Sequence, residues 1–362
     1  MKKTNNLNLN KDFINNFNKN KYILLTGGLG FIGFNLALIL NSIGFTNLII
    51  VDNIFNHNDN YNFLNQIKLK RLSEIKFINY FQKEKFLELI KDQKLISKYD
   101  LNKIGFIFHQ GACTNTLEQD LNYLLQNNFE YSKEILNFSK IFNIPLIFAS
   151  SASVYGNLKN RKRIEYNPLN YYALSKFLFD NYVINSLNAN ELRNIVIGLR
   201  YFNVYGFYEE HKGFMASVVF HFFNQAIKEN IIKVFEGSQN FFRDFIFIDD
   251  IVHINLFLFK IIMENEKLDN LSGIYDCGTS KPVSFITVAN IVKNYMQQKL
   301  NKKDINILEI PFPNELKNKY QFFTKANNKN LIEIFKKYNI NFRFTTIYKG
   351  VKKYIDYLLK NI

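Results

Sequence analysis

The sequence is poor in cysteine and histidine, with two and five among 362 residues, and no Cys/His cluster has the spacing of a metal site. The two cysteines, Cys113 and Cys277, cannot form a disulfide framework, which favours a reducing, cytoplasmic setting. No apolar run approaches the ~20 residues of a membrane span. Residues 1–20 are rich in lysine and asparagine and lack the apolar segment of a signal peptide. We therefore expect no metal, no membrane association and a polar, frayed N-terminal extension over 1–20.

The balance of charge is strongly basic, with a formal net charge of +15. Such a charge can indicate nucleic-acid binding, because a basic face releases counterions from a phosphate backbone. The lysines are scattered, however, and they accompany an excess of Asn, Ile, Phe and Tyr, the residues with A/T-rich codons. Charge without a clustered stripe is weak support for such binding, so we expect no nucleic-acid partner. A basic protein would still attract an anionic nucleotide substrate.

The stretch Thr26–Gly33, with the sequence TGGLGFIG, lies between a short apolar run and an apolar-periodic one. Gly27, Gly30 and Gly33 would in turn allow a tight turn, let backbone approach a pyrophosphate, and let a helix pack on a strand. A packing turn is the alternative. The next apolar run ends in Asp52, roughly 20 residues further on, where a dinucleotide fold places the carboxylate that accepts from a ribose hydroxyl. The pattern predicts a bound dinucleotide.

Strand-like and helix-like runs alternate along the first 200 residues, which predicts a parallel sheet with helices on both faces. The expected strands are 22–26, 48–52, 76–79, 104–109, 146–150 and 195–200, and the expected helices are 31–43, 83–91, 118–142 and 174–187. Residues 93–103 have the composition of a polar surface connection. A strand at 243–248, followed by a helix at 249–263, is expected to return to the main sheet.

The pattern becomes less regular after Gly206, which predicts a second domain built from discontinuous segments. The predicted fold class is α/β, a Rossmann-type doubly wound parallel sheet with a smaller, discontinuous C-terminal α/β substrate domain. The dinucleotide-binding domain is expected to comprise 21–202 and 243–280, and the substrate domain 203–242 and 281–362. The chain is long enough for both domains.

Small residues follow the expected fourth strand, in the stretch Phe108–Thr116. Gly111 and Ala112 suit a backbone that passes under a nicotinamide riboside or a pyrophosphate, although a tight strand-to-helix turn would also account for them. His109 precedes these residues and is expected to be a packing residue rather than a general base. Cys113 is interpreted as a small wall residue, because nothing beside it predicts a lowered thiol pKa.

Tyr172 and Lys176 are four residues apart and therefore share one helix face. An ammonium near a phenol favours the phenolate and lowers its pKa from the reference of about 10, which makes tyrosine a usable acid/base. Ser151, at the end of the fifth strand, can hold the oxygen that exchanges the proton, and Ser153 is a lesser candidate. A surface Tyr/Lys contact is the alternative, but consistency with the dinucleotide pattern favours an acid/base site.

With these residues in place, the chain resembles the extended short-chain dehydrogenase/reductase family, in which Gly-x-x-Gly-x-x-Gly, a strand-end serine or threonine and Tyr-x-x-x-Lys share the work. The resemblance implies that Ser151 and Tyr172 handle the proton, while Lys176 binds the nicotinamide ribose and depresses the tyrosine pKa. Within this family the chain resembles the ADP-L-glycero-D-manno-heptose 6-epimerases. That likeness covers nearly all of 21–356 and rests on HQGACT from His109, SKFLFD from Ser175, RYFNVYG from Arg200, HKGFMAS from His211, FEGS from Phe235, RDF from Arg243, and PFP from Pro311 with Tyr320.

The likeness implies an isomerase that inverts C6″ of ADP-D-glycero-D-manno-heptose and supplies heptose for the lipopolysaccharide core. The sugar would be oxidised transiently to a ketone and reduced again with a bound nicotinamide cofactor, NADP, with NAD possible. Lys212 would be the second acid/base group, placed across the sugar from Tyr172. The likeness also implies a cytoplasmic, bacterial homo-oligomer, specifically a homopentamer.

The same likeness implies the remaining site residues. Contacts to the cofactor are implied for Gly27, Gly30, Phe31, Ile32, Gly33, Asp52, Asn53, Lys83, Gln110, Gly111, Ala112, Cys113, Thr114, Asn127, Lys176 and Val204. Contacts to the ADP-sugar are implied for Asn203, His221, Phe235, Glu236, Gly237, Ser238, Arg243 and Tyr320. Side-chain chemistry agrees in part, because Arg243 offers a fork suited to a diphosphate and Asn203 can both donate to and accept from hydroxyls.

Two departures from the family pattern bear on this likeness. Phe214 stands where the family places a serine after Lys-Gly, so one hydroxyl contact to substrate is lost or replaced. The family's lysine a few residues past Asp52 is absent, because 53–66 contains no Lys or Arg. That cation would hold the 2′-phosphate of NADP, so Lys83 or His57 would have to take its place. We expect NADP to bind with a smaller preference over NAD than is usual in the family, and Lys83→Ala to reverse that preference.

Two other functional classes share these motifs. One is another nucleotide-sugar enzyme of the same fold, either a 4-epimerase or a 4,6-dehydratase. A dehydratase is expected to place Asp-Glu beside its strand-end threonine, whereas Ser151 is followed by Ala-Ser-Val. The other is a dinucleotide-binding protein without catalysis, which would commonly lose Tyr172 or Lys176, and both are present.

Overall fold

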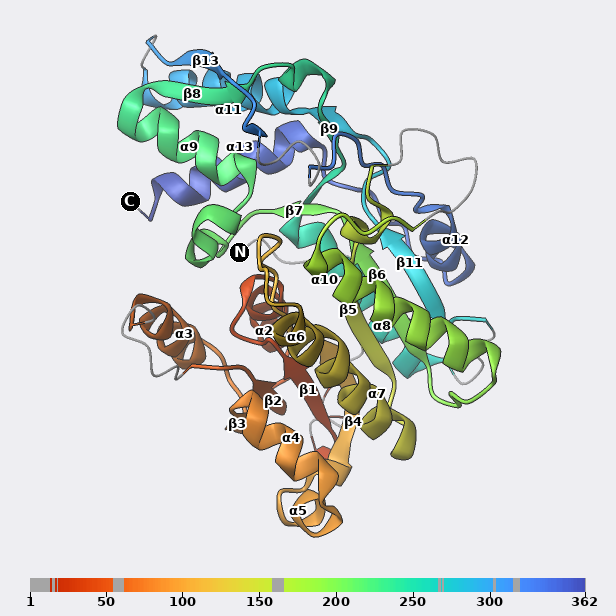
Figure 1. Ribbon diagram of the computed structural model, residues 1–362. Helices are drawn as coiled ribbons and strands as arrows, with labels where there is room; N and C mark the ends of the chain where they lie inside the picture. The colour runs from red at the N-terminus through yellow and green to blue at the C-terminus, as the bar shows by residue number, and fades with distance from the viewer. Residues whose placement is uncertain are drawn as a thin grey trace.

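Seven parallel strands form the central sheet of the molecule (Figure 1). The computed structural model describes residues 14, 17, 19–54, 62–157, 166–265, 268, 270–301, 304–314 and 320–361. In sheet order the strands are β11 (Gly273–Cys277), β6 (Val196–Tyr201), β5 (Leu146–Ser151), β4 (Ile104–His109), β1 (Tyr22–Thr26), β2 (Leu48–Val51) and β3 (Asn79–Phe81). The chain order reverses between β1 and β4, the kind of switch point at which such sheets bind ligands. The predicted α/β, Rossmann-type sheet is confirmed.

Helices cover both faces of this sheet because successive strand residues point to opposite sides. In β1, Ile23 and Leu25 join the hydrophobic core of one face, while Leu24 joins that of the other. The first core includes side chains of α2 (Phe31–Ser42) and α10 (Ile248–Glu264). The second includes side chains of α4 (Lys83–Lys91), α7 (Tyr131–Ile141) and α8 (Tyr171–Asn188).

Three small two-stranded sheets lie outside the central sheet. They pair β8 (Ile231–Phe235) with β13 (Asn306–Ile310), β7 (Asn203–Tyr205) with β10 (Phe245–Phe247), and β9 (Phe242–Arg243) with β12 (Val283–Ser284). In Figure 1 the β8–β13 pair lies at the top with α9 (Val218–Glu229), α11 (Phe285–Leu300) and α13 (Ile347–Leu359). These elements come from sequence segments on both sides of α10 and β11, as the expected discontinuous pattern requires.

The other described helices connect these layers. They are α3 (Asn62–Glu74), α5 (Gln93–Lys98), α6 (Leu121–Leu124), α12 (Lys329–Lys337), the π-helical segment η3 (Leu125–Glu130), and the 3₁₀ turns η2 (Leu101–Lys103), η4 (Ala152–Tyr155), η5 (Glu210–Met215) and η6 (Ser238–Asn240). The helix expected over 118–142 therefore starts at Leu121 and contains a π-helical stretch. The first helices match closely, since α2 was expected at 31–43 and α4 at 83–91.

Two described residues of the N-terminal stretch, Ile14 and Phe17, depart from the expectation of a frayed extension over 1–20. Ile14 and Phe17 are buried in the main core, at 7% and 4% exposure. The Phe17 ring packs edge-on against Phe45 and Phe259, with centroids 5.5 and 6.0 Å apart. Two apolar side chains spaced three apart thus anchor the end of this polar stretch to the sheet's helical layer.

Three element predictions are wrong. The expected strand at 76–79 starts only at Asn79, because the apolar side chains that suggested it, Phe77 and Ile78, face solvent. The expected polar connection at 93–103 contains α5, whose start is capped by Asp92 and which buries Ile96. The expected strand at 243–248 does not join the main sheet; β10 pairs with β7, and the return strand is β11 beside β6.

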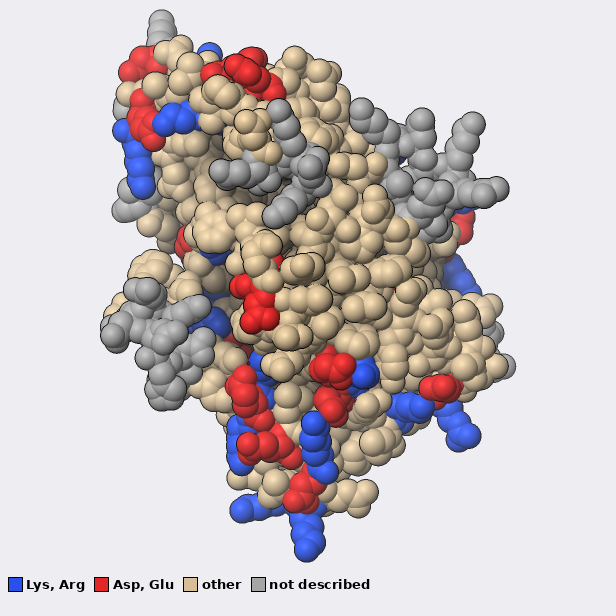
Figure 2. Space-filling model, viewed as in Figure 1, with Lys and Arg blue, Asp and Glu red and all other residues tan. Residues whose placement is uncertain are grey.

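Among the described residues, no helix is long and apolar enough to cross a membrane. Within that same part of the chain, no group of three or more His, Cys, Asp and Glu side chains could hold a metal ion. Figure 2 shows Lys and Arg interspersed with Asp and Glu over the lower part of this face, around α4 and α5, with few charges across its middle. The basic charge is therefore not gathered into one stripe on the face shown.

Candidate active site

The glycine loop after β1 is shaped by close backbone contacts that only glycine allows. Gly27 has φ +63°, and a Cβ there would lie 2.6 Å from the Cα of Gly111. A Cβ on Gly33 would lie 2.1 Å from the carbonyl oxygen of Gly27. Gly30 precedes α2 and cannot cap its first N–H groups with a side chain, which leaves them available to an anion. This cradle suits the pyrophosphate of a dinucleotide.

Asp52 follows β2 and holds the glycine loop through its carboxylate. Its Oδ2 accepts from the backbone N–H of Leu29 at 2.9 Å, and its Oδ1 accepts from the N–H of Asn53 at 2.8 Å. Lys68 of α3 donates to the same Oδ1 at 2.7 Å and to the carbonyl oxygen of Asn53 at 2.7 Å. Among the described residues, the cation paired with Asp52 is therefore Lys68, just beyond the stretch 53–66 that contains no Lys or Arg.

Lys83, Asn53 and Asn127, which the likeness assigns to the cofactor, are brought together. The backbone N–H of Lys83 donates to Oδ1 of Asn53 at 3.0 Å, and its ammonium donates to Oδ1 of Asn127. The ammonium also lies 3.2 Å from the carboxylate of Glu84. The ammonium of Lys83 is thus already bound to two side chains of the protein. His57, the other cation considered for the 2′-phosphate, lies outside the described residues.

His109, at the end of β4, is a packing residue as expected. It is 2% exposed, and its ring nitrogens lie 2.7 Å from the hydroxyl of Thr26 and 2.8 Å from that of Ser132. Burial lowers the pKa of His109 to about 3, so the ring is neutral near pH 7. The hydroxyl of Thr26 also accepts from the N–H of Gly111 at 3.2 Å, which ties the next loop to β1.

The residues that follow β4 lie against α8 through Asn128, a residue the sequence analysis missed. Asn128 accepts from the N–H of Cys113 at 2.8 Å and donates to its carbonyl oxygen at 2.9 Å. It also donates to the hydroxyl of Ser175 at 3.0 Å. The π-helical form of η3, frequent at functional sites, places Asn128 here. Burial raises the pKa of the Cys113 thiol, in keeping with its predicted inert role.

Gln110 offers a polar group at the same place. Its Oε1 accepts from the hydroxyl of Tyr201 at 3.1 Å, while its buried Nε2 has no hydrogen-bond partner among the described residues. A buried donor without a partner costs free energy unless another group satisfies it. The next residue is Gly111, which packs on Gly27 of the glycine loop. The unpaired amide and the glycine cradle together fit a dinucleotide.

The Tyr172, Lys176 and Ser151 side chains meet at the carboxyl end of β5. Burial raises the pKa of Tyr172, and a hydrogen bond with Ser151 acts in the opposite direction. The ammonium of Lys176 donates to the carbonyl oxygen of Ala149 at 2.9 Å, and burial lowers its pKa to about 8. The expectation that Lys176 lowers the Tyr172 pKa is wrong here, because removal of the phenol from water dominates. Ser153 donates to Ser151 at 2.9 Å and supports it.

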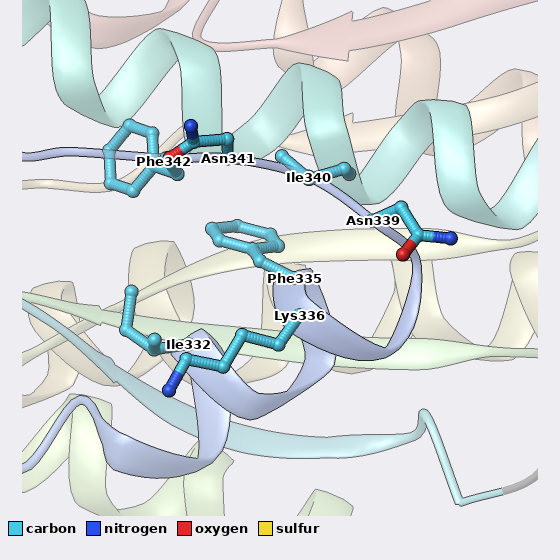
Figure 3. Close-up of a pocket in the computed structure, with 7 residues that line it drawn as sticks. All are labelled: Ile332, Phe335, Lys336, Asn339, Ile340, Asn341 and Phe342. Atoms are coloured by element: carbon cyan, nitrogen blue, oxygen red, sulfur yellow. The ribbon is translucent and has the colours of Figure 1, made fainter.

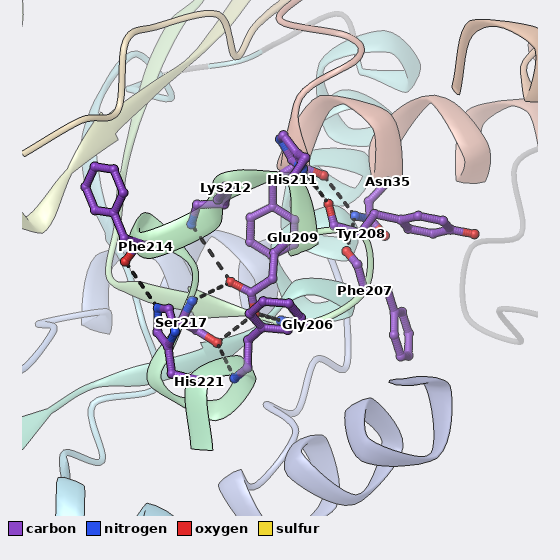
Figure 4. Close-up of polar contacts among 12 residues, drawn as sticks. Asn35, Gly206, Phe207, Tyr208, Glu209, His211, Lys212, Phe214, Ser217 and His221 are labelled. Atoms are coloured by element: carbon purple, nitrogen blue, oxygen red, sulfur yellow. Dashed lines mark hydrogen bonds and ion pairs between the residues drawn. The ribbon is translucent and has the colours of Figure 1, made fainter. Parts of the chain in front are cut away.

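Lys212 reaches the glycine loop from the segment that follows β7. Its ammonium lies over the ring of Phe31, 5.1 Å from the centroid, and 3.9 Å from the carboxylate of Glu209 (Figure 4). Burial lowers the pKa of Lys212, while Glu209 acts in the opposite direction. Glu209 is fully buried and accepts from the N–H of Gly206 at 3.1 Å and of Ser217 at 2.7 Å. Sequence reasoning did not find this anchor.

Among the residues of this part of the chain, Asn203 and Phe214 are exposed, whereas His221 is half-buried. Phe214, in the family's serine position, is 67% exposed, and its carbonyl oxygen lies 3.2 Å from Nε2 of His221. The side chain of Asn203 is exposed at the start of β7, and its Oδ1 accepts weakly from Thr324 at 3.5 Å. Val204 follows Asn203 and pairs with β10. Phe214 itself offers no hydroxyl to a substrate.

A cluster of aromatic rings surrounds Arg243 between β9 and the C-terminal segments. The guanidinium of Arg243 lies over the Tyr320 ring, 4.9 Å from its centroid, and burial lowers its pKa to about 10. The Phe312 ring lies 5.2 Å from that of Phe235 and 5.3 Å from that of Tyr320. Ser238, after Phe235 in the FEGS segment, is 1% exposed and its hydroxyl has no partner among the described residues. Four of the implied substrate residues thus lie in this region: Phe235, Ser238, Arg243 and Tyr320.

A separate hollow of about 370 Å³ lies beside α12 (Figure 3). It is lined by Ile332, Phe335, Lys336, Asn339, Ile340, Asn341 and Phe342. None of these described lining residues belongs to the predicted cofactor or substrate sites. A hollow of about 340 Å³ does border the aromatic cluster, lined by Asn240, Phe241, Phe322 and Phe323.

The parallel sheet, the glycine cradle and the Tyr172/Lys176 helix are features of dinucleotide-dependent epimerases and dehydratases. Residues 23–273 match the NAD dependent epimerase/dehydratase family, and the chain belongs to that family. Membership implies a nicotinamide dinucleotide cofactor, which the cradle and the unpaired Gln110 amide fit.

Two proteins show the likeness of this chain to known enzymes, one in sequence and one in structure. The chain is 43% identical to the ADP-L-glycero-D-manno-heptose-6-epimerase of Brachyspira hyodysenteriae over 343 residues, which cover 94% of this chain and 98% of that one. It resembles the crystal structure of the Helicobacter pylori ADP-L-glycero-D-manno-heptose-6-epimerase with a TM-score of 0.72 and 25% identity, over 96% of this chain and 98% of that one.

The fold is shared more widely. The UDP-N-acetylglucosamine 4-epimerase of Methanobrevibacter ruminantium matches with a TM-score of 0.71 and 20% identity, over 95% of this chain and 99% of that one. At that identity the likeness shows the fold alone.

Proposed function

We propose that this protein is an isomerase that inverts C6″ of ADP-D-glycero-D-manno-heptose to give ADP-L-glycero-D-manno-heptose. The observation that carries the proposal is the pair of candidate proton-transfer groups, the buried Tyr172 at the start of α8 and the half-buried Lys212 over Phe31 of the glycine loop. The 43% identity to an enzyme of that name over nearly the whole chain supports the choice of sugar. Cytoplasmic location and homo-oligomeric assembly stay predictions from the resemblance.

The cofactor would be held by the glycine cradle, the Asp52 region and the loop after β4, with Lys176 near the ribose. When bound, it supplies a hydride acceptor at C6″ that becomes the donor when the ketone is reduced. Gln110 would satisfy its unpaired Nε2 by donating to the bound dinucleotide. We propose NADP as the preferred cofactor, with NAD accepted, because Lys68 adds a positive charge beside Asp52.

The two proton-transfer groups have pKa values displaced in opposite directions, as acid and base partners need. Burial raises the pKa of Tyr172, which favours the protonated phenol as the acid. Burial lowers the pKa of Lys212, which makes its neutral amine more accessible as the base. For one epimer, Lys212 takes the C6″ hydroxyl proton and Tyr172 gives its own proton to the ketone oxygen, after which the two groups regain their starting protonation by exchange with water. For the other epimer the same transfers run in reverse, with Tyr172 as the base and Lys212 as the acid. Ser151 orients the oxygen beside Tyr172.

The nucleotide part of the substrate would lie against the aromatic cluster around Arg243. A buried guanidinium forms two parallel hydrogen bonds with phosphate oxygens, and the Tyr320 and Phe235 rings offer faces for stacking. Asn203 and His221 would contact hydroxyl groups of the sugar, with Glu236, Gly237 and Ser238 along the nucleotide. The division into a cofactor domain (21–202 and 243–280) and a substrate domain (203–242 and 281–362) is proposed on the same basis.

The direct test is the product formed from ADP-D-glycero-D-manno-heptose by the purified full-length protein. We expect the C6″ epimer, identified by its proton NMR couplings, in a mixture that reaches the same ratio from either sugar. A Tyr172→Phe, Lys212→Met double variant is the control, and it should form no product while retaining its cofactor. Product inverted at C4″ instead, or loss of water from the sugar, would replace the proposal with one of the other enzymes of this fold.

A further inference from the structure

Arg71 is a buried cation that joins three segments of the chain. It lies on α3, is 3% exposed, and donates to the carbonyl oxygens of Leu29 at 2.8 Å and Tyr208 at 2.6 Å. Its Nη2 also lies 3.0 Å from Nδ1 of His211 and 3.7 Å from the carboxylate of Glu210. The fork of one guanidinium therefore connects α3, the glycine loop and the segment that starts η5.

At the glycine loop, Arg71 and Asp52 together bind both polar backbone atoms of Leu29. The N–H of Leu29 donates to Asp52, and the carbonyl oxygen of Leu29 accepts from Arg71. Asp52 is in turn bound by Lys68, three residues before Arg71 on α3. Both polar backbone atoms of this residue, which lies between Gly28 and Gly30, are thus linked to one helix.

At the other end, the contacts of Arg71 stop one residue short of Lys212. Arg71 binds Tyr208 and His211, while Asn35 of α2 donates to the carbonyl oxygen of Phe207 at 2.9 Å (Figure 4). Burial and the Arg71 charge lower the pKa of His211 to about 3, so at pH 7 the ring is neutral. Its Nδ1 lies 3.0 Å from Arg71 and 3.1 Å from the carbonyl oxygen of Tyr208, and it accepts from Arg71 in the tautomer that carries its proton on Nε2. The backbone that leads into Lys212 is therefore fixed to the cofactor-binding layer.

We infer that Arg71 is a positioning residue, which holds the Lys212 segment against the glycine loop so that the Lys212 ammonium stays over Phe31. The inference rests on the proposed acid/base role of Lys212. Without Arg71, the carbonyl oxygens of Leu29 and Tyr208 lose a charge-assisted donor in a buried place. A misplacement of about 1 Å can cost about 10²-fold in rate, even when it originates away from the chemistry.

The first test is a double-mutant cycle on the holoenzyme with ADP-D-glycero-D-manno-heptose. Arg71→Ala should lower kcat by about 10²-fold with KM little changed, and Lys212→Met by roughly 10²- to 10⁴-fold. If Arg71 acts through Lys212, the double variant is no slower than Lys212→Met alone. Lys70→Met, an exposed neighbour on α3, is the matched control and should keep the wild-type kcat. Multiplicative losses in the double variant would overturn the inference.

The second test does not depend on activity. Hydrogen exchange of the backbone amides in 207–215 should be about tenfold faster in Arg71→Ala, with β11 unchanged and cofactor retained. Equal exchange in the two proteins would overturn the inference. Should Arg71→Ala not fold, Arg71→Lys keeps the charge but not the fork, and it should show the same faster exchange in a folded protein with reduced kcat; wild-type values would count against Arg71. A wild-type protein that does not convert the sugar refutes the proposed function, while the exchange result still judges the positioning role.

Discussion

Burial acts on Tyr172 and Lys212 in opposite directions, and this is a property of single residues in their surroundings. The sequence places Tyr172 and Lys176 one helical turn apart, which suggested a lowered phenol pKa. In the folded chain the ammonium of Lys176 is directed to the carbonyl oxygen of Ala149, and burial raises the pKa of Tyr172. The spacing of two residues predicts that they are neighbours, whereas the sign of a pKa shift depends on solvent exclusion by residues far along the chain.

Replacing either proposed proton-transfer group should affect the rate more than the fold. We expect Tyr172→Phe and Lys212→Met each to lower kcat by roughly 10²- to 10⁴-fold, because each removes a general acid or base. Circular dichroism and cofactor content measured beside the steady-state kinetics serve as controls. A near-wild-type kcat in Lys212→Met would mean that Tyr172 serves both epimers. Lys176→Met should also weaken cofactor binding.

Cofactor choice tests the residue that the sequence analysis missed. Lys68→Ala should weaken NADP binding by about tenfold or more relative to NAD, since Lys68 is the cation on the Asp52 carboxylate and a charged hydrogen bond contributes ~1.5–3 kcal/mol. Lys83→Ala, which the sequence alone predicts to reverse the preference, should have the smaller effect because the Lys83 ammonium is bound to Asn127 and Glu84, whereas Lys68 is bound to the Asp52 carboxylate itself. The measurement is competitive binding to apo protein at fixed ionic strength. Equal weakening of both cofactors by Lys68→Ala would exclude Lys68 from the phosphate site.

Acid stability should depend on His109. Its pKa is about 3 in the folded chain, against 6.5 for an exposed histidine, so the unfolded chain binds one more proton between these values. The contribution to stability is complete above pH 6.5 and is lost as pH falls towards 3, with a slope of up to ~1.4 kcal/mol per pH unit. Denaturant unfolding of wild type and His109→Gln between pH 7 and 5 should show a shallower dependence in the variant. Parallel curves would contradict the buried, neutral state of His109.

At the scale of elements, local sequence patterns predicted the helices and strands whose formation depends on neighbouring residues. Strands β1 and β4 and helix α4 have the expected bounds, because the two strands are short apolar runs and the helix has a strong helical periodicity. Helix α3 was not expected, since its apolar residues do not form one buried stripe: Phe63 and Leu69 are exposed. This unpredicted helix matters for the proposed function, because α3 carries Lys68 and Arg71. Its position is fixed by polar contacts to distant segments, which no short window of sequence contains.

The N-terminal segment provides a test of an element that composition alone misjudged. Phe17→Ala should lower the free energy of unfolding by about 3 kcal/mol, as expected for removal of a buried phenyl ring from between Phe45 and Phe259. Phe63→Ala is the matched control, because Phe63 is 68% exposed and its loss should change stability by less than about 0.5 kcal/mol. Urea unfolding of both variants decides the matter. An equal, small effect would mean that the segment adds nothing to the core.

At the scale of the whole molecule, the candidate site is assembled from segments far apart in the sequence. Three of these segments each carry a motif that can be recognised in the sequence: the glycine loop, the Tyr172/Lys176 helix and the Lys212 segment. The contacts that hold these segments together were not predictable from the sequence. Arg71 and His211 are 140 positions apart, and Lys68 reaches Asp52 only because of where the fold places α3. Motifs are local, whereas the positioning of one motif against another is a property of the fold.

The central claim is that hydride leaves C6″ of the sugar and returns to the same carbon without net consumption of cofactor. The most direct measurement uses ADP-D-glycero-D-manno-heptose carrying deuterium at C6″, incubated with the holoenzyme in ordinary water without added NADP or NAD. We predict an epimerised product that retains the deuterium at C6″, with many turnovers per enzyme and no accumulation of reduced cofactor. Loss of the deuterium to solvent, or turnover that stops unless cofactor is supplied in proportion to product, would contradict the account.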